Sequence, residues 1–262
     1  MTSDFPVINM FWDGAQLGPV HAACVRSFLR HGHRVVLHCY TPPSDRPEGL
    51  ELFDATRIMP RSDLLVNRTT GSVALGVNRY RYRMLAEGMG IYADCDMYCL
   101  RPIPDADYIF GWEDERNINN AFLKYPADSA LARMLVAETQ SEFSPPRAVG
   151  RRRKFLLRAR KTLGFPQSVR DMPWGVWGPH LLTDCVRRLG LEEKAQPIDI
   201  FYPLHCFNTA LLFEPGLRIE DLATPRTQAI HLWHKMQDKR PPPPGSPLRQ
   251  VIDSLHADGP SR

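Results

Sequence analysis

The chain has 262 residues, of which 43% are hydrophobic and 24% are charged, and its formal net charge is +4. These values are ordinary for a soluble globular protein, and the mild charge does not by itself imply a nucleic-acid partner. No apolar run reaches the roughly 18 residues that a membrane-spanning helix needs, and the first residues lack the pattern of a secretory signal.

The first 40 residues read as a strand, a helix and a second strand. Residues 5–12 form an apolar run, residues 17–33 carry apolar side chains at helical spacing, and residues 34–40 are β-branched and apolar. This order predicts a βαβ unit with a parallel pair of strands. A third short strand is predicted at 55–60.

Strands and helices continue to alternate along the rest of the chain. A helix is predicted from about Val73 to the glycines Gly88 and Gly90, and a later helix has Asp128 as its expected N-cap. The remaining predictions are strands from Ile91, at 107–114, at 119–126 and at 229–234, and helices at 128–143 and 178–190. Together they predict an α/β fold with a mainly parallel central sheet flanked by helices, which binds ligands beyond the carboxyl ends of its strands.

A proline-rich break at 240–247 predicts where this fold ends. We expect a single domain over residues 1–240. Residues 241–262 would then be the break and a C-terminal tail, formed either by a peripheral helix or by a frayed end.

None of the cysteines lies in a C-x-x-C spacing. Cys95 and Cys99 come closest, but on a predicted strand they lack the tight turn that zinc sites use. We therefore expect reduced thiols and a cytoplasmic protein. The cysteines are Cys24, Cys39, Cys95, Cys99, Cys185 and Cys206.

Two aspartates, Asp94 and Asp96, follow the apolar start of the strand that begins at Ile91. In an extended chain their side chains point to the same side, about 6.5–7 Å apart, and Cys95 points into the core. Two carboxylates so placed repel each other unless a positive group lies near, and Mg²⁺ or Mn²⁺ is the usual one. An isolated D-x-D is more often a solvated turn, so the tripeptide alone is a weak signal.

The stretch "NRYRYRMLAEGMGIYADCDMYCLRPI", residues 78–103, resembles the sugar-binding DXD region of retaining glycosyltransferases with the GT-A fold. This family contains bacterial polysaccharide and lipooligosaccharide transferases and is related to eukaryotic α-1,4-galactosyltransferases. "NNAFLKYP", "WGPHLLT" and "IHLWH" match in the same order, so the resemblance covers most of residues 5–236. The matching positions in the region itself are Arg81, Leu85, Gly90, Tyr92, Asp94 and Asp96.

Two positions depart from the family pattern. Asn78 stands where the family has an aspartate, which weakens any role that depends on charge. Met89 replaces the first glycine of a Gly-Gly pair, so Gly88 and Gly90 are expected to keep the turn.

The resemblance implies a metal site for Mn²⁺ or Mg²⁺. Asp96 would be a direct ligand and His231 a second one from a distant strand, with His234 as the runner-up. Asp94 would contact the ribose, the sugar hydroxyls or a metal-bound water. Without the resemblance, a packed core histidine is the simpler interpretation of His231.

The resemblance also implies donor-binding and catalytic residues. Trp12 would stack on the nucleotide base, Arg81 would reach the donor, and Tyr92 would pack against it or fill the core. Asn78 belongs to the same donor-binding group, and Asn120 would lie on the sugar face opposite the leaving group. The alternatives are a core tryptophan, a surface ion pair of Arg81 and a turn at a strand edge.

For the acceptor, the resemblance points to Trp177 and Gly178 at the start of a helix, together with His234. A glycine there permits close approach of the backbone, and a helix N-terminus favours negative groups.

The segment Arg147–Lys161 carries eight basic residues and no acid. If helical, its apolar strip fits the anionic inner face of a membrane, where lipid-linked acceptors reside. The alternatives are a solvated helix or a loop that lines the groove of an acidic acceptor. Nucleic-acid binding is not expected, because interleaved aromatic residues are lacking.

These observations predict a metal-dependent glycosyltransferase that moves a hexose from a UDP- or GDP-sugar to a glycan or lipid-linked acceptor in bacterial surface polysaccharide synthesis. Retention of configuration is implied by the resemblance alone. The alternatives are a nucleotide-sugar hydrolase and a non-catalytic glycan-binding protein with the same fold. The motifs G-x-S-x-G, G-x-x-x-x-G-K-[ST] and G-x-G-x-x-G are missing, which argues against serine hydrolases, P-loop proteins and dinucleotide-binding enzymes.

Overall fold

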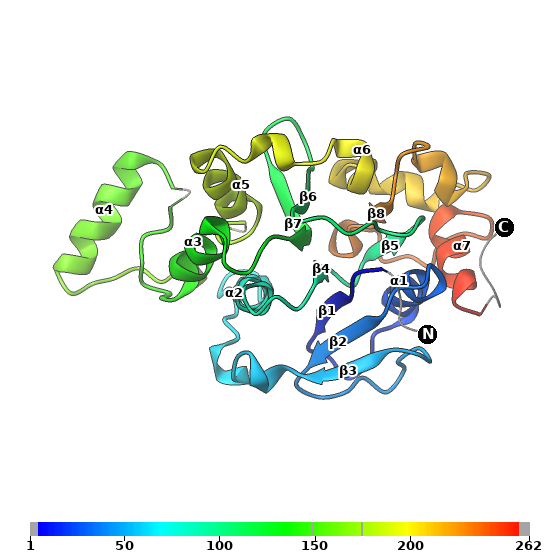
Figure 1. Cartoon of the computed structure of the whole chain (residues 1–262), viewed down its shortest axis with the longest axis horizontal. Coiled ribbons are helices and arrows are strands. Elements are labelled where there is room, and N and C mark those ends of the chain that lie inside the picture. Colours follow the sequence, from blue (N-terminus) through cyan, green and yellow to red (C-terminus); the bar gives the residue numbers. More distant parts are fainter. Residues whose placement is uncertain (1–4, 148, 174, 257–262) are drawn as a thin grey trace.

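A six-stranded sheet forms the central layer of the protein (Figure 1). The computed structural model describes residues 5–147, 149–173 and 175–256. The strand order is β3-β2-β1-β4-β7-β6; β1 to β4 run parallel, and β7 is antiparallel to both β4 and β6. This confirms the predicted α/β class with a mostly parallel sheet. The strands are β1 (Ile8–Trp12), β2 (Val35–Cys39), β3 (Glu51–Asp54), β4 (Ile91–Ala93), β6 (Ile109–Trp112) and β7 (Ile118–Lys124).

Helices cover both faces of this sheet because side chains alternate along its strands. On β1, Ile8 and Met10 belong to the core under α1 and α7, whereas Phe11 belongs to the core under α2, α3 and α5. The helices are α1 (Pro19–Arg30), α2 (Ala74–Ala86), α3 (Ala130–Thr139), α4 (Arg151–Thr162), α5 (Pro179–Arg188), α6 (Ile198–Phe201) and α7 (Pro247–Asp253). None of the helices in the described ranges has the length and apolar character that crossing a bilayer requires.

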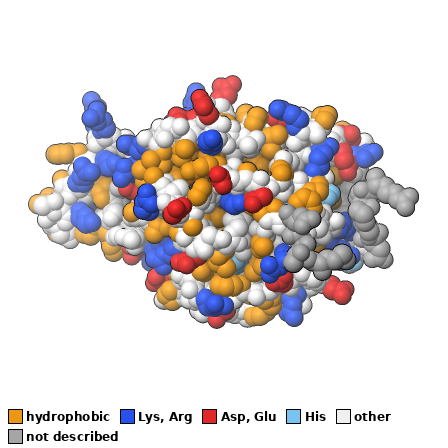
Figure 2. Space-filling model, in the orientation of Figure 1, with side chains coloured by type: hydrophobic (Ala, Val, Ile, Leu, Met, Phe, Trp, Pro, Cys, Tyr) orange, Lys and Arg blue, Asp and Glu red, His pale blue; other side chains and the backbone are white. Residues whose placement is uncertain are grey.

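The two ends of the molecule differ. At one end, α7 packs on α1, and its Leu248 and Val251 lie in the core that α1 covers, although the sequence predicts only a peripheral helix or a tail there. At the other end α4 extends away from the sheet (Figure 1). Basic and hydrophobic side chains gather at that end (Figure 2).

The predicted third strand at 55–60 is wrong. The strand lies one segment earlier, at Glu51–Asp54, and residues Ala55–Arg57 form a 3₁₀ turn. Asp54 caps this turn by accepting a hydrogen bond from the amide of Thr56. β3 is an edge strand with mostly exposed side chains, so it carries no apolar run that would mark it in the sequence.

Two predicted element ends also shift. The N-cap of α3 is Ser129, whose hydroxyl accepts from the amide of Ala132, and not Asp128. The last strand, β8 (Ala229–His231), stops before the predicted His234. Trp233 takes a left-handed conformation with φ of 53°, which a strand cannot accommodate, and a 3₁₀ turn follows.

A second, two-stranded sheet joins β5 (Met97–Cys99) to β8 in antiparallel pairing, with Met97 opposite His231. Asp94, Cys95 and Asp96 form the turn between β4 of the large sheet and β5 of the small one, closed by a hydrogen bond from Met97 N to Asp94 O of 3.0 Å. The extended geometry expected for the two aspartates is therefore wrong. Cys95 is buried, as predicted.

Gly90 sets the entry to this turn. Its φ is +111°, and a Cβ atom there would lie 2.7 Å from the carbonyl oxygen of Val7, so only glycine lets β4 lie this close to the chain before β1. The carbonyl of the neighbouring Met89 accepts a hydrogen bond of 2.6 Å from the Asn9 side chain, which ties this turn to β1.

Candidate metal centre

Asp94, Asp96 and His231 come together where the two sheets meet. One ligand atom from each side chain lies within 4.8 Å of the other two. The two carboxylates are partly exposed and the imidazole is buried. Carboxylate oxygens suit Mg²⁺ and Mn²⁺, and a neutral imidazole nitrogen is a common ligand of divalent transition metals. The donor set therefore fits a divalent cation such as Mn²⁺.

Asp96, which is partly exposed, and His231, which is buried, form an ion pair. The Nε2 atom of His231 lies 3.2 Å from Asp96 Oδ1, and the backbone amide of His234 donates to Asp96 Oδ2 at 3.0 Å. Burial opposes ionisation of Asp96, but the charge and hydrogen bond of His231 outweigh it and hold the pKa of Asp96 well below its usual range. Burial likewise opposes the charge of His231, yet Asp96 raises the pKa of that imidazole. A metal that took these ligands would replace the proton on His231.

The second nitrogen of His231 is not the one beside Asp96. Nδ1 is buried and has no hydrogen-bond partner among the described residues. A cation shared with Asp96 would therefore take Nε2, which lies 3.2 Å from Asp96 Oδ1.

Asp94 is held by one oxygen and offers the other. Its Oδ1 accepts from Arg81 Nη2 at 2.8 Å and from the Tyr92 hydroxyl at 2.9 Å. Within the described ranges no hydrogen bond to Oδ2 is recorded, and 29% of the side chain is exposed. Asp94 is thus oriented with one oxygen left for a ligand.

Arg81 is a buried positioning residue. Only 5% of its side chain is exposed; it donates to Asp94 and to the carbonyl of Asn120, and its guanidinium lies 4.2 Å from the Tyr92 ring centroid. Burial acts against its charge, but the nearby Asp94 carboxylate raises the pKa of Arg81. The alternative of a surface ion pair is therefore wrong, and Arg81 reaches the site through Asp94.

A buried amide network lies beneath the turn. The Asn120 side chain donates to Asn78 Oδ1 at 2.8 Å and to the Tyr82 hydroxyl at 3.1 Å. Gly178 closes over these groups, since a Cβ atom there would lie 3.2 Å from Asn78 Nδ2. Asn78, which stands where a charged residue was expected, is thus a hydrogen-bond partner for Asn120 that needs no counter-charge.

Trp177 is a core residue in this structure. Its side chain is 1% exposed, its carbonyl accepts from the Tyr82 hydroxyl at 2.8 Å, and the Arg79 guanidinium lies 5.0 Å from its ring centroid. The structure thus brings Gly178 to the buried network but leaves the Trp177 side chain without an exposed face for an acceptor.

Three rings in tilted and edge-on contact form a row beside the metal-ligand cluster. The ring centroids of Trp12 and His21 are 4.5 Å apart, and those of His21 and His234 are also 4.5 Å apart. Trp12 lies at the carboxyl end of β1, where its indole donates to the carbonyl of Gln16. Burial, and next the nearby His234, lower the pKa of His21, which favours a neutral ring.

His21 and Glu113 are site residues that the sequence did not reveal. His21 lies on α1, and its place beside Trp12 depends on how that helix packs. Glu113 follows β6 and accepts a hydrogen bond from the Asn119 side chain. Burial raises the pKa of Glu113, and its charge is among those that act on His231. For Glu113, the only sequence signal was that it and Asp114 form a pair of acids at the end of the strand predicted at 107–114.

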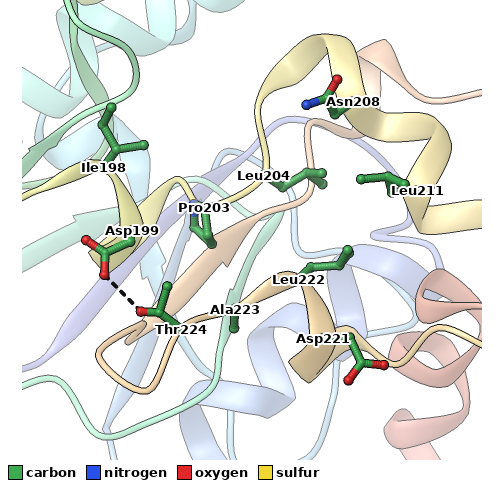
Figure 3. A pocket seen from close by; sticks show the side chains of 10 residues that line it. All are labelled: Ile198, Asp199, Pro203, Leu204, Asn208, Leu211, Asp221, Leu222, Ala223 and Thr224. Carbon is green, nitrogen blue, oxygen red and sulfur yellow. Dashed lines mark hydrogen bonds between the residues drawn. The ribbon is translucent and has the colours of Figure 1, made fainter.

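A separate hollow of about 530 Å³ lies beside α6 (Figure 3). The carboxylate of Asp199 in its lining already accepts hydrogen bonds from the Thr224 hydroxyl and from Arg226. None of the predicted site residues lines it, so we assign it no part in the chemistry. Its lining is Ile198, Asp199, Pro203, Leu204, Asn208, Leu211, Asp221, Leu222, Ala223 and Thr224.

Comparison with known proteins adds little to this geometry. No family model and no curated protein sequence matches the chain. Among solved structures, the chain is similar to the PaToxG glycosyltransferase, with a TM-score of 0.41, 10% sequence identity and 72% of each chain covered. Similarity at this level does not assign a family or an activity, so the function is argued from the residues of the site.

Proposed function

We propose that the protein is a metal-dependent glycosyltransferase of the GT-A type. The observation that carries the proposal is the meeting of Asp94, Asp96 and His231, since Asp96 and His231 are 135 residues apart in the chain. They lie near the carboxyl ends of the parallel strands β1 and β4, where α/β sheets bind ligands. The substrate would be a nucleotide diphospho-sugar that gives a hexose to a glycan or lipid-linked acceptor.

Asp96 and His231 would hold the cation directly, and Asp94 would contribute its free oxygen. Mn²⁺ or Mg²⁺ supplies positive charge beside the diphosphate leaving group, where negative charge builds up as the glycosidic bond breaks. Arg81 and Tyr92 fix Asp94 through its other oxygen. The His234 amide keeps Asp96 in place.

The row of rings and the amide network suit a donor bound between them. Trp12 and His21 present aromatic faces for a uracil or guanine base. Asn120, held by Asn78 and Tyr82, would lie beneath the sugar. With the base on one side and the sugar on the other, the diphosphate would lie against the Asp94–Asp96 turn.

Retention of configuration would follow from a same-face displacement. The bond from the sugar C1 to the diphosphate oxygen breaks, and the acceptor hydroxyl oxygen forms its bond to C1 on the face that the diphosphate leaves. The hydroxyl proton passes to the departing diphosphate. Glu113 is the carboxylate to watch, because a sugar trapped covalently on it, seen by mass spectrometry, would replace this mechanism with a double displacement.

The test is a panel of UDP- and GDP-sugars with Mn²⁺, read by thermal shift and by release of the nucleoside diphosphate. We expect one donor to stabilise the protein only when Mn²⁺ is present, and Asp96→Ala to lose that shift. A shift of equal size in Asp96→Ala would contradict the site. Asp253→Ala, which removes an exposed carboxylate from α7, is the matched control.

The same experiment separates the alternatives. Fast sugar release without any acceptor would favour a nucleotide-sugar hydrolase. Binding that depends on Mn²⁺ but gives no turnover with any donor would favour a non-catalytic glycan-binding protein.

We also propose that the protein acts in bacterial surface polysaccharide synthesis, in the cytoplasm near the inner face of the membrane.

A further inference from the structure

Helix α4 carries an unbalanced positive charge. Between Phe143 and Arg170 the sequence has no aspartate or glutamate. Among the described residues, none of the basic side chains of α4 is recorded in an ion pair, whereas the preceding Arg147 binds Glu138. The basic side chains of α4 are Arg151, Arg152, Arg153, Lys154, Arg158, Arg160 and Lys161.

The same helix presents an apolar face away from the body of the protein. Leu157 is its buried residue, packed in the core that α2, α3 and α5 share. Phe155 is 74% exposed and Leu156 is 61% exposed, and beyond the helix end Leu163 and Phe165 are 73% and 72% exposed. At helical spacing Phe155, Leu156 and the C-cap residue Leu163 fall within about 100° of one another and roughly opposite Leu157, so they form an exposed apolar strip.

A basic hollow borders this strip. It has a volume of about 310 Å³ and is lined by Arg151, Lys154, Phe155 and Arg158 of α4 and by Arg188 of α5. Arg188 also pairs with Asp184, whereas no ion pair of the other three cations is recorded within the described ranges. A hollow with this lining matches a phosphate group attached to an apolar chain.

We propose that α4 docks the protein on an anionic lipid bilayer. Phe155, Leu156, Leu163 and Phe165 enter the boundary between headgroups and acyl chains, and the flanking arginines and lysines bind lipid phosphates. The position of α4 at the end of the long axis leaves its outer face open (Figures 1 and 2). The inference does not rest on the proposed function, because docking needs no sugar donor.

Charge and shape favour a bilayer over two other occupants. A nucleic acid would satisfy the cations but would leave the exposed apolar strip in water. A second copy of this chain would cover the strip but would bring two uncompensated basic helices together. A bilayer with anionic headgroups satisfies both features at once.

The test is vesicle flotation of the full chain. Wild type is compared on phosphatidylcholine vesicles and on vesicles in which roughly a third of the lipid is phosphatidylglycerol, a content that gives a strongly negative surface. We expect binding to the anionic vesicles only. Two double variants of the α4 region are compared with wild type. Phe155→Ser with Leu163→Ser changes the apolar strip, and Arg152→Glu with Arg160→Glu reverses two cations. Each should weaken binding about tenfold or more.

Matched controls change similar groups elsewhere. Phe207→Ser removes a ring that is 81% exposed, and Arg46→Glu with Lys194→Glu reverses two exposed cations outside α4. Both controls should bind the vesicles as wild type does. The proposal would be overturned if the α4 variants and the control variants lost vesicle binding equally, or if wild type did not bind the vesicles.

Two further readouts test the rival occupants. The first readout compares wild type with the Phe155→Ser, Leu163→Ser variant. If both proteins bind duplex DNA equally well, and both also bind anionic vesicles equally well, the surface is a general polyanion site and the proposal fails. If light scattering shows a wild-type dimer that this variant converts to a monomer, the strip is covered by a second copy and the proposal also fails. A monomer whose vesicle binding needs the strip supports it.

Discussion

The metal-ligand cluster and helix α4 handle charge in different ways. In the cluster, Asp96 lies against His231 and Asp94 lies against Arg81, and these groups come from segments far apart in the chain. In α4 the charges come from one continuous segment and stand exposed without recorded partners in the described ranges. The cluster is ordered by the fold before any ligand arrives, whereas in the docking proposed above the cations of α4 would meet their counter-charges only on a bilayer.

This difference sets where substitutions should be costly. A buried charge that loses its partner keeps its desolvation penalty, and breaking such a pair costs far more than breaking a solvated one. Changes in the cluster should therefore affect both activity and stability. Changes on the outer face of α4 should affect neither in solution.

The largest effect is expected for Asp96→Asn. The amide keeps the shape of the side chain but removes the charge that pairs with His231 and would bind the cation. We expect turnover to fall by more than about 100-fold, because loss of even an outer partner of a metal ligand costs 10–100-fold. Initial rates at saturating Mn²⁺ measure it, with Arg152→Gln on α4 as the control that should keep wild-type turnover. An activity within about threefold of wild type would remove Asp96 from the site.

Stability should separate a buried ion pair from an exposed one. Arg81→Met leaves Asp94 without its buried partner, and we expect a loss of about 3–4 kcal/mol in the free energy of unfolding. Arg34→Met breaks the exposed pair with Glu51, whose side chains are 55% and 48% exposed, and should cost far less than Arg81→Met does. Urea unfolding of both variants measures the difference. Equal losses would mean that Arg81 does not act through a desolvated pair.

The sequence predicted the members of the cluster better than its geometry. Asp94, Asp96, His231 and Arg81 could be named because the resemblance marks them. The turn that carries the aspartates between two sheets was not predicted, since the apolar residues on either side read as one strand. The pairing of Met97 with His231, which creates the second sheet, depends on a contact that no local pattern encodes.

Residues whose role depends on packing were the ones that sequence reasoning missed or misplaced. His21 was not singled out on its predicted helix, and Trp177 was assigned to the acceptor because of the resemblance. Only the packing of α1 against β5, and of α5 against β7, decides that His21 lies beside the site and that the Trp177 side chain does not. Helix α4 is the opposite case. Its composition was enough to predict a basic surface with an apolar strip, and only its position in the fold had to come from the structure.

A buried neutral histidine should give the body of the protein an acid sensitivity that α4 lacks. His38 is fully buried, with Nε2 2.9 Å from Asn9 Oδ1 and Nδ1 2.8 Å from the Tyr80 hydroxyl, and burial lowers its pKa to about 4. The unfolded chain binds a proton near pH 6.5, and the folded chain does not until about pH 4. The stability from His38 is therefore complete above pH 6.5 and is lost as the pH falls toward 4, by about 3 kcal/mol in all.

The check compares urea midpoints at neutral pH and near pH 4.5. His38→Gln keeps a hydrogen-bonding side chain but cannot titrate, so its stability should fall less between the two pH values than that of wild type. His256→Gln, at an exposed position, should keep the wild-type dependence. A His38→Gln variant with the full wild-type loss would show that other groups cause the acid sensitivity.

The smallest effect distinguishes two adjacent leucines of α4. Leu157 is 5% exposed and attaches the helix to the core, whereas Leu156 is 61% exposed. Leu157→Ala should lower the free energy of local opening by about 2 kcal/mol, and trypsin, which cleaves after arginine and lysine, should then nick the helix roughly 30-fold faster. Leu156→Ala should change the rate by no more than about twofold. If the two variants were cleaved at equal rates, Leu157 would not anchor the helix, and α4 could not hold its apolar strip in a fixed direction toward a bilayer.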